Sequence, residues 1–335
     1  MKREQRQQGI ALVTALFVVA LATIAAVAMF EAANIAVHRS ANTAQSESEW
    51  WYGVGAESWV KGVLIADAKL NAANNGIVGL NGLWAQEVAL PIDGGGIRGH
   101  IEDLQGRFNL NNLGIGPLGS TTTGANNTSS ATGALMYIQQ FDRLLDSLPN
   151  FDASKYHGLG YAIRDWIDAD DQRSGTEGAE DQDYLSQDPP YRAANRPMIS
   201  PSELLLVRGV TKELYAALAP YVTALPSANA TAININTAPA PVLMSLGLNI
   251  NQAALQKFMQ LRKTEPATSA STIQGTGEFA FIPAGSPAVP VATTSIYFEM
   301  QAQVFIGSGR LALYSVFYRP SGGLPVVIAH STNTE

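Results

Sequence analysis

The chain has 335 residues, of which 46% are hydrophobic, and its formal net charge is −7. It contains no cysteine, which excludes a disulfide framework and a thiolate-bound metal. The acidic balance argues against a nucleic-acid partner, because binding to phosphates depends on lysines and arginines. A chain of this length is expected to form two domains.

The N-terminus combines a short basic leader, residues 1–9, with an apolar segment, residues 10–30. The leader carries three cationic side chains against one acidic side chain and ends at Gly9, whereas the apolar segment contains no charge and no proline. At about 1.5 Å per residue, a helix over this segment spans the roughly 30 Å hydrocarbon core of a bilayer. No small-residue cleavage site follows, unlike in an ordinary secretory signal. We therefore predict a transmembrane helix that the mature protein retains.

The long helix is expected to continue well beyond the membrane segment. Apolar and small residues recur at helical spacing, without proline, to about residue 71. A linker rich in glycine and asparagine follows over residues 71–82. Alternation of apolar and polar residues over 83–92 and 97–110, with three glycines between them, predicts a β-hairpin.

Alternation returns near the C-terminus. Residues 296–307 and 310–319 are predicted to form two strands, and residues 307–309 have the right length for the turn between them. Residues 324–330 can supply one more strand.

Between the two groups of strands, the apolar residues recur at helical spacing. Their i, i+3, i+4 stripe predicts an amphipathic helix with this apolar face: Leu135, Ile138, Phe141, Leu144, Leu145 and Leu148. Ser200, Pro201 and Glu203 form a capping box with proline at the first helical position. Three further short helices are expected to begin at these residues: Thr211, Thr237 with Pro239, and Asn249 or Asn251.

These elements together predict an α+β fold. The strands over 83–110 would lack partners unless they pair with the C-terminal strands, so we expect one antiparallel sheet interrupted by an inserted all-α domain. The expected divisions are the leader (1–9), the transmembrane helix (10–30), the rest of the long helix with the first strands (31–118), the inserted helical domain (119–270) and the C-terminal strands (271–335).

The segment from Arg164 to Arg192 is strongly acidic. It contains nine acidic residues against three arginines, so nearly all of the net charge lies in one loop. Crowded carboxylates repel one another, and a hard cation that takes six to eight oxygen ligands would relieve this repulsion. The segment does not follow the EF-hand pattern, because Gln172 and Ser174 stand where carboxylates or asparagines are expected. A solvated acidic loop without an ion is the alternative interpretation.

Motifs typical of enzymes and DNA-binding proteins are weak in this chain. The four histidines are scattered, and no HExxH or GxSxG sequence is present. Gly94, Gly96 and Gly99 match GxGxxG, but a strand rather than a helix is expected after them. Residues 202–222 and 235–261 resemble helix-hairpin-helix units, yet they offer few basic residues for DNA. We therefore expect these hairpins to pack within the helical domain.

The junction between Gly9 and Ile10 resembles the class III leader of type IV pilins and pseudopilins, in which a membrane peptidase cuts after the glycine. Those subunits usually carry a glutamate at the fifth mature position, where this chain has Thr14. The absence of this glutamate is a hallmark of the minor pseudopilin K family of type II secretion systems. The motifs DWIDAD, GAED and PPYRAAN, followed by SELLLV, also resemble the signature block of that family.

This resemblance implies a structural subunit without catalytic activity, with a pilin-like long helix and sheet. The subunit would be anchored in the bacterial inner membrane through residues 10–30, with its body in the periplasm. Prepilin peptidase would cut between Gly9 and Ile10, and Ile10 would be N-methylated. Minor pseudopilins I and J, and then the other pseudopilins, would be its partners in a complex at the tip of the pseudopilus, which initiates assembly and supports protein export.

The resemblance also implies calcium as the ion of the acidic loop. The implied ligands are Asp168, Asp170, Glu180 and Asp181, with Asp171 and Asp183 as possible ligands of a second ion. Two other functions are carried as alternatives. One is a minor pilin of a type IV pilus, and the other is a membrane-tethered periplasmic hydrolase that uses carboxylates of the acidic loop.

Overall fold

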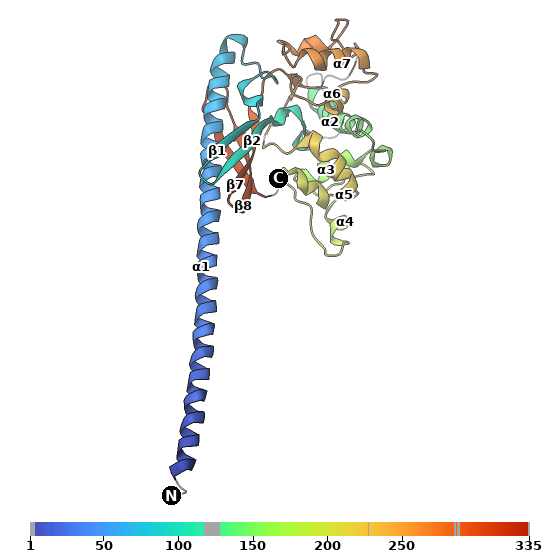
Figure 1. The fold of residues 1–335 in the computed structure, drawn as a ribbon. Coiled ribbons are helices and arrows are strands. Elements are labelled where there is room, and N and C mark those ends of the chain that lie inside the picture. Colours follow the sequence, from blue (N-terminus) through green and yellow to red (C-terminus); the bar gives the residue numbers. More distant parts are fainter. Residues whose placement is uncertain (1–3, 117–127, 227, 285, 287–288, 334–335) are drawn as a thin grey trace.

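The computed structural model consists of one long helix with a sheet and a group of short helices beside its C-terminal part (Figure 1). It describes residues 4–116, 128–226, 228–284, 286 and 289–333. Helix α1 (Glu4–Asn71) has 68 residues, which corresponds to a length of about 100 Å. Its N-terminal part is long and apolar enough to cross a membrane, and the most apolar stretch is 0% buried against the rest of the chain. The predicted long helix is confirmed.

A five-stranded antiparallel sheet packs beside α1. Its strand order is β1-β2-β7-β8-β9, and the strands are β1 (Val88–Ile92), β2 (Gly95–Asp103), β7 (Tyr297–Ile306), β8 (Gly309–Tyr318) and β9 (Val326–Thr332). Strand β2 pairs with β7 in a register that places Ile101 opposite Met300. The N-terminal and C-terminal strands therefore belong to one sheet that a long insertion interrupts, which confirms the predicted α+β class.

One face of the sheet is covered by α1. Val60 and Leu64 of the helix are buried against a cluster of sheet residues: Ile101, Phe298, Met300, Ala302, Leu313 and Phe317. Burial of each large apolar side chain contributes about 1.5–3 kcal/mol, so this seam accounts for the attachment of α1 to the sheet. Gly53 permits the close approach, because a Cβ atom there would lie 2.9 Å from Cδ2 of Leu313.

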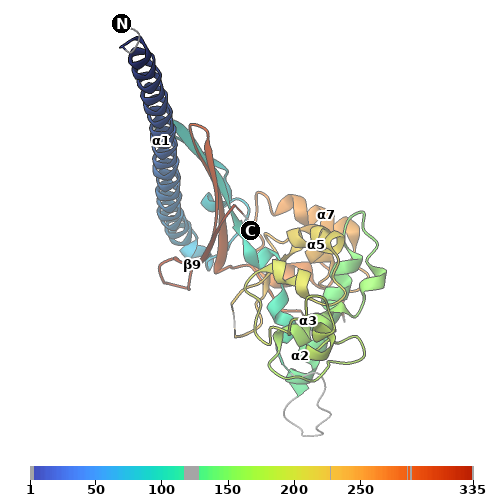
Figure 2. The same ribbon diagram turned by 90° about the horizontal axis from the view of Figure 1, so that it is seen from below.

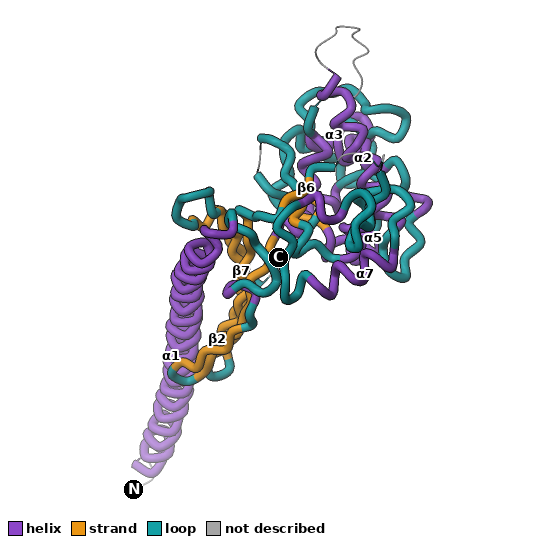
Figure 3. Tube along the Cα trace, turned by 90° about the horizontal axis from the view of Figure 1, so that it is seen from above, coloured by secondary structure: helices purple, strands orange, loops and turns teal. Residues whose placement is uncertain are grey.

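The insertion between β2 and β7 forms a second unit, which we call the helical body. Its α-helices are α2 (Thr128–Asp146), α3 (Leu159–Ile167), α4 (Asp181–Leu185), α5 (Lys212–Leu218), α6 (Ala240–Met244) and α7 (Gln252–Leu261). Two short parallel pairs join its ends, β3 (Phe108–Asn109) with β4 (Val222–Thr223) and β5 (Ile233–Asn234) with β6 (Val291–Ala292). The sheet stands between α1 and the helical body (Figure 2), and α2 and α3 lie farther from α1 than β2 and β7 do (Figure 3).

The core of the helical body extends beyond the expected limits of 119–270. Phe108, Leu110 and Leu113 belong to it on the N-terminal side, and Phe281 and Val289 belong to it on the C-terminal side. The apolar residues that follow β2 therefore pack among the helices and not with the sheet. The alternation over residues 97–110 predicts one strand, whereas β2 ends at Asp103. Part of the expected division, residues 119–127, lies outside the described residues.

The helix starts that were expected within the insertion are only partly as predicted. Thr211 caps α5 and Asn251 caps α7. The capping box at Ser200 is present but begins a 3-10 helix, Pro201–Leu206. Thr237 does not cap α6, because its hydroxyl donates to Asp103 instead. On α2, Leu135 is 41% exposed whereas Ala134 is 0% exposed, so the buried stripe runs through Ala134 and Ile138 and leaves Leu135 outside it.

A buried polar network joins the helical body to the sheet. Asp103, at the end of β2, accepts hydrogen bonds from Asn234 at 2.8 Å and from Thr237 at 2.7 Å. Ser295, just before β7, donates to the same carboxylate at 2.6 Å. Burial raises the pKa of Asp103, and these hydrogen bonds oppose the shift. Groups from both crossings between the units thus meet at one carboxylate, which fixes the helical body against the sheet.

Candidate metal centre

Three carboxylates converge at one side of the helical body. Asp165 lies in the last turn of α3, Asp168 is the residue at which α3 ends, and Glu180 is the residue that precedes α4. Each offers one oxygen atom, and these three atoms all lie within 4.8 Å of one another. The loop between α3 and α4 therefore folds back so that its two ends present acidic groups to a common point.

Several oxygen atoms of this cluster are buried and have no hydrogen-bond donor among the described residues. Asp165 is 0% exposed and Glu180 is 4% exposed. Within the described part of the chain, one oxygen of Asp165, one of Asp168 and both of Glu180 are buried and without a partner. Leaving a charged group buried and unpaired costs several kcal/mol, so a solvated acidic loop does not describe this arrangement.

Burial in this cluster raises the pKa of all three carboxyl groups. Burial, followed by the charges of Asp165 and Asp168, raises the pKa of Glu180 to about 7. Burial raises the pKa of Asp168 to about 6, although Arg164 opposes the shift. The pKa of Asp165 is also raised, chiefly by burial. The three groups resist being ionised together unless a cation neutralises them.

The backbone around the cluster is shaped to bring these groups together. The Ser174 N–H donates to Asp165 at 2.9 Å, which draws the loop over the end of α3. A Cβ atom at Gly178 would lie 2.3 Å from Oδ2 of Asp165, so only glycine fits there. Arg164 lies 3.5 Å from Asp168 and also donates to the carbonyl of Leu113. The loop is thus tied to the helical body at several points.

The other carboxylates named from the sequence do not converge with these three. Asp170 accepts from the Gln172 N–H at 2.9 Å within its own turn. Asp171 accepts from the side chain of Asn195 at 3.3 Å. The remaining two are engaged elsewhere, Asp181 with Ala193 and Arg192, and Asp183 with Arg173 and Arg208. Asp168 and Glu180 are therefore the expected ligands that the structure brings together.

Sequence reasoning did not select Asp165 as a ligand, although a signal was present. Asp165 and Asp168 are three residues apart, a spacing that places two side chains on one face of a helix. Asn195 was not selected either. Among the described residues its Oδ1 has no hydrogen-bond partner and is buried, and its N–H donates to the carbonyl of Trp166, the residue after Asp165, at 3.0 Å.

The donor set suits a hard divalent cation. It consists of carboxylate oxygens, and the chain has no thiolate to favour a softer metal. A set of several carboxylate oxygens fits Ca²⁺ better than Mg²⁺, which demands near-ideal octahedral geometry and retains its waters. Gly9 and Ile10, where the resemblance predicts peptidase cleavage, lie in the first turns of α1, at the end of that helix away from the helical body (Figure 1).

The raised pKa of Glu180 predicts that the folding stability of the chelator-treated protein decreases as the pH rises. A carboxyl whose pKa is about 7 in the folded protein, against 4.5 for an exposed glutamate, binds more protons in the folded than in the unfolded state between those pH values. Its stabilising contribution is therefore fully present below about pH 4.5 and is lost as the pH rises through about 7. The midpoint temperature of thermal unfolding in EGTA should therefore decrease as the pH is raised from about 5 to about 8. The Glu180→Gln variant should show a flatter profile, and equal slopes for the two proteins would contradict the assignment.

Comparisons with known proteins agree with this architecture. The family described as Type II secretion system (T2SS), protein K, matches residues 106–227 and 233–292. A chain from the crystal structure of the GspK-GspI-GspJ complex of the enterotoxigenic Escherichia coli type 2 secretion system superimposes with a TM-score of 0.66 and 25% identity. That match covers 89% of this chain and 100% of the other.

Curated relatives match over nearly the whole length. Type II secretion system protein K of Aeromonas hydrophila is 34% identical over 322 residues, which is 94% of each chain. The protein K of Pseudomonas aeruginosa is 32% identical and covers 96% of this chain and 92% of its own. That of Pectobacterium carotovorum is 33% identical, with coverage of 96% and 95%. The chain therefore belongs to the type II secretion system protein K family, a family of pseudopilins in protein transport.

Proposed function

We propose that this protein is the minor pseudopilin at the tip of a type II secretion pseudopilus, where it joins minor pseudopilins I and J to initiate assembly and support export across the outer membrane. The observation that carries the proposal is the match to a whole chain of the GspK-GspI-GspJ complex. The shape supports it as well. The helical body lies beside the end of α1 that is farthest from the N-terminus (Figure 1), where its bulk needs no room for a subunit stacked above.

The long helix supports anchorage in the inner membrane through residues 10–30, with the body in the periplasm. The leader would be removed between Gly9 and Ile10 by prepilin peptidase, followed by N-methylation of Ile10. The hydroxyl of Thr14 donates to the carbonyl of Ala11 at 3.0 Å, so this polar group is satisfied within its own helix. A glutamate at this position would need a neutralising partner in the membrane. The chain can therefore take a place in the fibre that offers no such partner.

A structural calcium ion in the helical body completes the proposal. Asp165, Asp168 and Glu180 would hold it, and it would neutralise the charges that burial disfavours. In the bound state its chemistry is to link the two ends of the loop between α3 and α4 through oxygen ligands. The role is structural rather than catalytic. Of the histidines, His100 and His157 contact acidic residues that lie outside the metal cluster.

Assembly with the two other minor pseudopilins is the first test. The full-length protein carrying a C-terminal affinity tag would be co-expressed with pseudopilins I and J and prepilin peptidase, and then purified from solubilised membranes. We expect a complex of all three subunits by native mass spectrometry, with this chain beginning at Ile10. Minor pilins of a type IV pilus serve as control partners. Association with those pilins in place of I and J would support the pilin alternative.

Calcium binding is tested by stability. Thermal unfolding of the full-length protein in detergent would be measured in calcium and in EGTA. At a calcium concentration one hundred times the Kd, the folded state should gain about 2.7 kcal/mol, which raises the unfolding temperature. The gain should disappear in Glu180→Gln. It should persist in Glu278→Gln, the same chemical change at a carboxylate whose side chain is 65% exposed. If calcium leaves wild-type unfolding unchanged, the proposed ion is excluded.

A further inference from the structure

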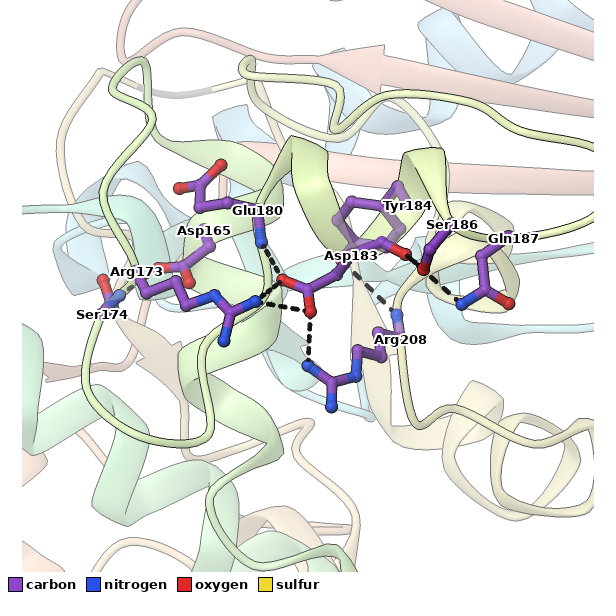
Figure 4. A network of polar contacts seen from close by, with 9 residues as sticks. All are labelled: Asp165, Arg173, Ser174, Glu180, Asp183, Tyr184, Ser186, Gln187 and Arg208. Atoms are coloured by element: carbon purple, nitrogen blue, oxygen red, sulfur yellow. Dashed lines mark hydrogen bonds and ion pairs between the residues drawn. The ribbon is translucent and has the colours of Figure 1, made fainter.

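Beside the cluster of Asp165, Asp168 and Glu180, one further carboxylate accepts hydrogen bonds from two segments, the loop between α3 and α4 and the residues after the 3-10 helix Pro201–Leu206 (Figure 4). The guanidinium of Arg173, within the acidic loop, donates to both oxygens of Asp183 at 2.6 Å. Arg208, which follows the 3-10 helix Pro201–Leu206, donates to one of them at 2.9 Å. The N–H of Glu180 donates to the other at 3.0 Å. We call Asp183, Arg173 and Arg208 the clasp.

The clasp holds the loop between α3 and α4 at two points. At its C-terminal end it holds the backbone of Glu180, whose two carboxylate oxygens are buried and have no partner among the described residues. Near the middle of the loop it holds Arg173, whose neighbour Ser174 donates to Asp165. Figure 4 shows Asp165 and Glu180 on the side of the network away from Arg208. Movement of Asp183 would therefore disturb the placement of two of the three clustered carboxylates.

The surroundings of Asp183 disfavour its use as a ligand itself. Both of its oxygens already accept hydrogen bonds, and two guanidinium groups lie against them. A divalent cation at the same carboxylate would be repelled by those positive charges. The side chain of Asp183 is only 12% exposed, so water screens this repulsion weakly.

Placement rather than stability is the expected contribution of the clasp. The side chains of Arg173 and Arg208 are 47% and 52% exposed. Ion pairs with such exposed partners contribute little to folding stability, with a median of about 0–1 kcal/mol. Groups that orient metal ligands from outside the first coordination sphere have a larger effect on binding, and their loss typically weakens metal affinity about 10–100-fold.

We propose that Asp183 is a positioning residue of the calcium site, which the paired arginines Arg173 and Arg208 hold so that the backbone of Glu180 directs its carboxylate toward Asp165 and Asp168. This inference rests on the calcium ion of the proposed function. It assigns a role to three residues that contribute no ligand atom. It also replaces the expectation that Asp183 binds a second ion.

Calcium titration of the full-length protein in detergent tests the clasp. Asp183→Asn and the double variant Arg173→Gln/Arg208→Gln should bind calcium about 10–100-fold more weakly by isothermal titration calorimetry, with the number of bound ions unchanged. Arg208→Lys keeps the positive charge and should lose less affinity than Arg208→Gln. Lys257→Gln removes an exposed ion pair elsewhere, with Glu278 at 3.4 Å, and should bind as the wild type does.

A second readout reports on ligand placement. Terbium bound in place of calcium can be excited through Trp166, which is adjacent in sequence to Asp165, and its luminescence lifetimes in H₂O and D₂O count the bound waters. Loss of the clasp should increase that count, because Glu180 no longer reaches the ion. A change limited to global stability would not move it.

The outcomes separate the clasp from the ion. If wild type binds calcium and Asp183→Asn binds it equally well with the same water count, the clasp is refuted and the ion stands. If Asp183→Asn binds one ion fewer while the remaining affinity is unchanged, Asp183 is a ligand and the inference is wrong. If wild type binds no calcium, both the ion and the clasp are refuted.

Discussion

The burial of three carboxylates at one point is the strongest constraint on the acidic loop of the helical body. Asp165, Asp168 and Glu180 place several oxygen atoms without donors inside the protein. Such a cluster is stable only if it is protonated or if a cation neutralises it. The loop between α3 and α4 has few apolar residues of its own, so its shape depends on this neutralisation and on the ties that Gly178, Ser174 and Arg164 provide. Much of the negative charge of the sequence therefore lies in the loop between α3 and α4, where it constrains the shape of that loop.

A second set of polar contacts connects the helical body to the long helix. Asp103, at the crossing from the sheet to the helical body, accepts hydrogen bonds from Asn234 of that body and from Ser295 at the return crossing. Arg319, at the end of β8, donates to the carbonyl of Ser295 and lies 3.4 Å from Asp67 of α1. Because these groups are buried, each lost partner would leave an unsatisfied polar atom, which costs about 1–3 kcal/mol. The long helix α1, the sheet and the helical body are therefore held in one arrangement.

The periodic parts of the fold could be predicted from the sequence, because a long apolar helix and alternating strands express their environment residue by residue. The boundary between the sheet and the helical body was harder to predict from the sequence. Phe108 and Leu110 continue the alternation of β2, yet they pack among helices, and only tertiary contacts decide this. The carboxylate cluster was predicted only in part. Asp168 and Glu180 converge, but Asp165 was missed, and Asp183 lies in an ion-pair network that sequence spacing cannot distinguish from a ligand shell.

The central proposal is a cation bound between the three buried carboxylates. The most direct measurement is an anomalous difference map from crystals of the protein grown in calcium, with data collected where calcium scatters anomalously. The account predicts a peak about 2.3–2.6 Å from oxygens of Asp165, Asp168 and Glu180. A map without a peak there at millimolar calcium, with the carboxyl groups hydrogen-bonded to one another or to water, would contradict it.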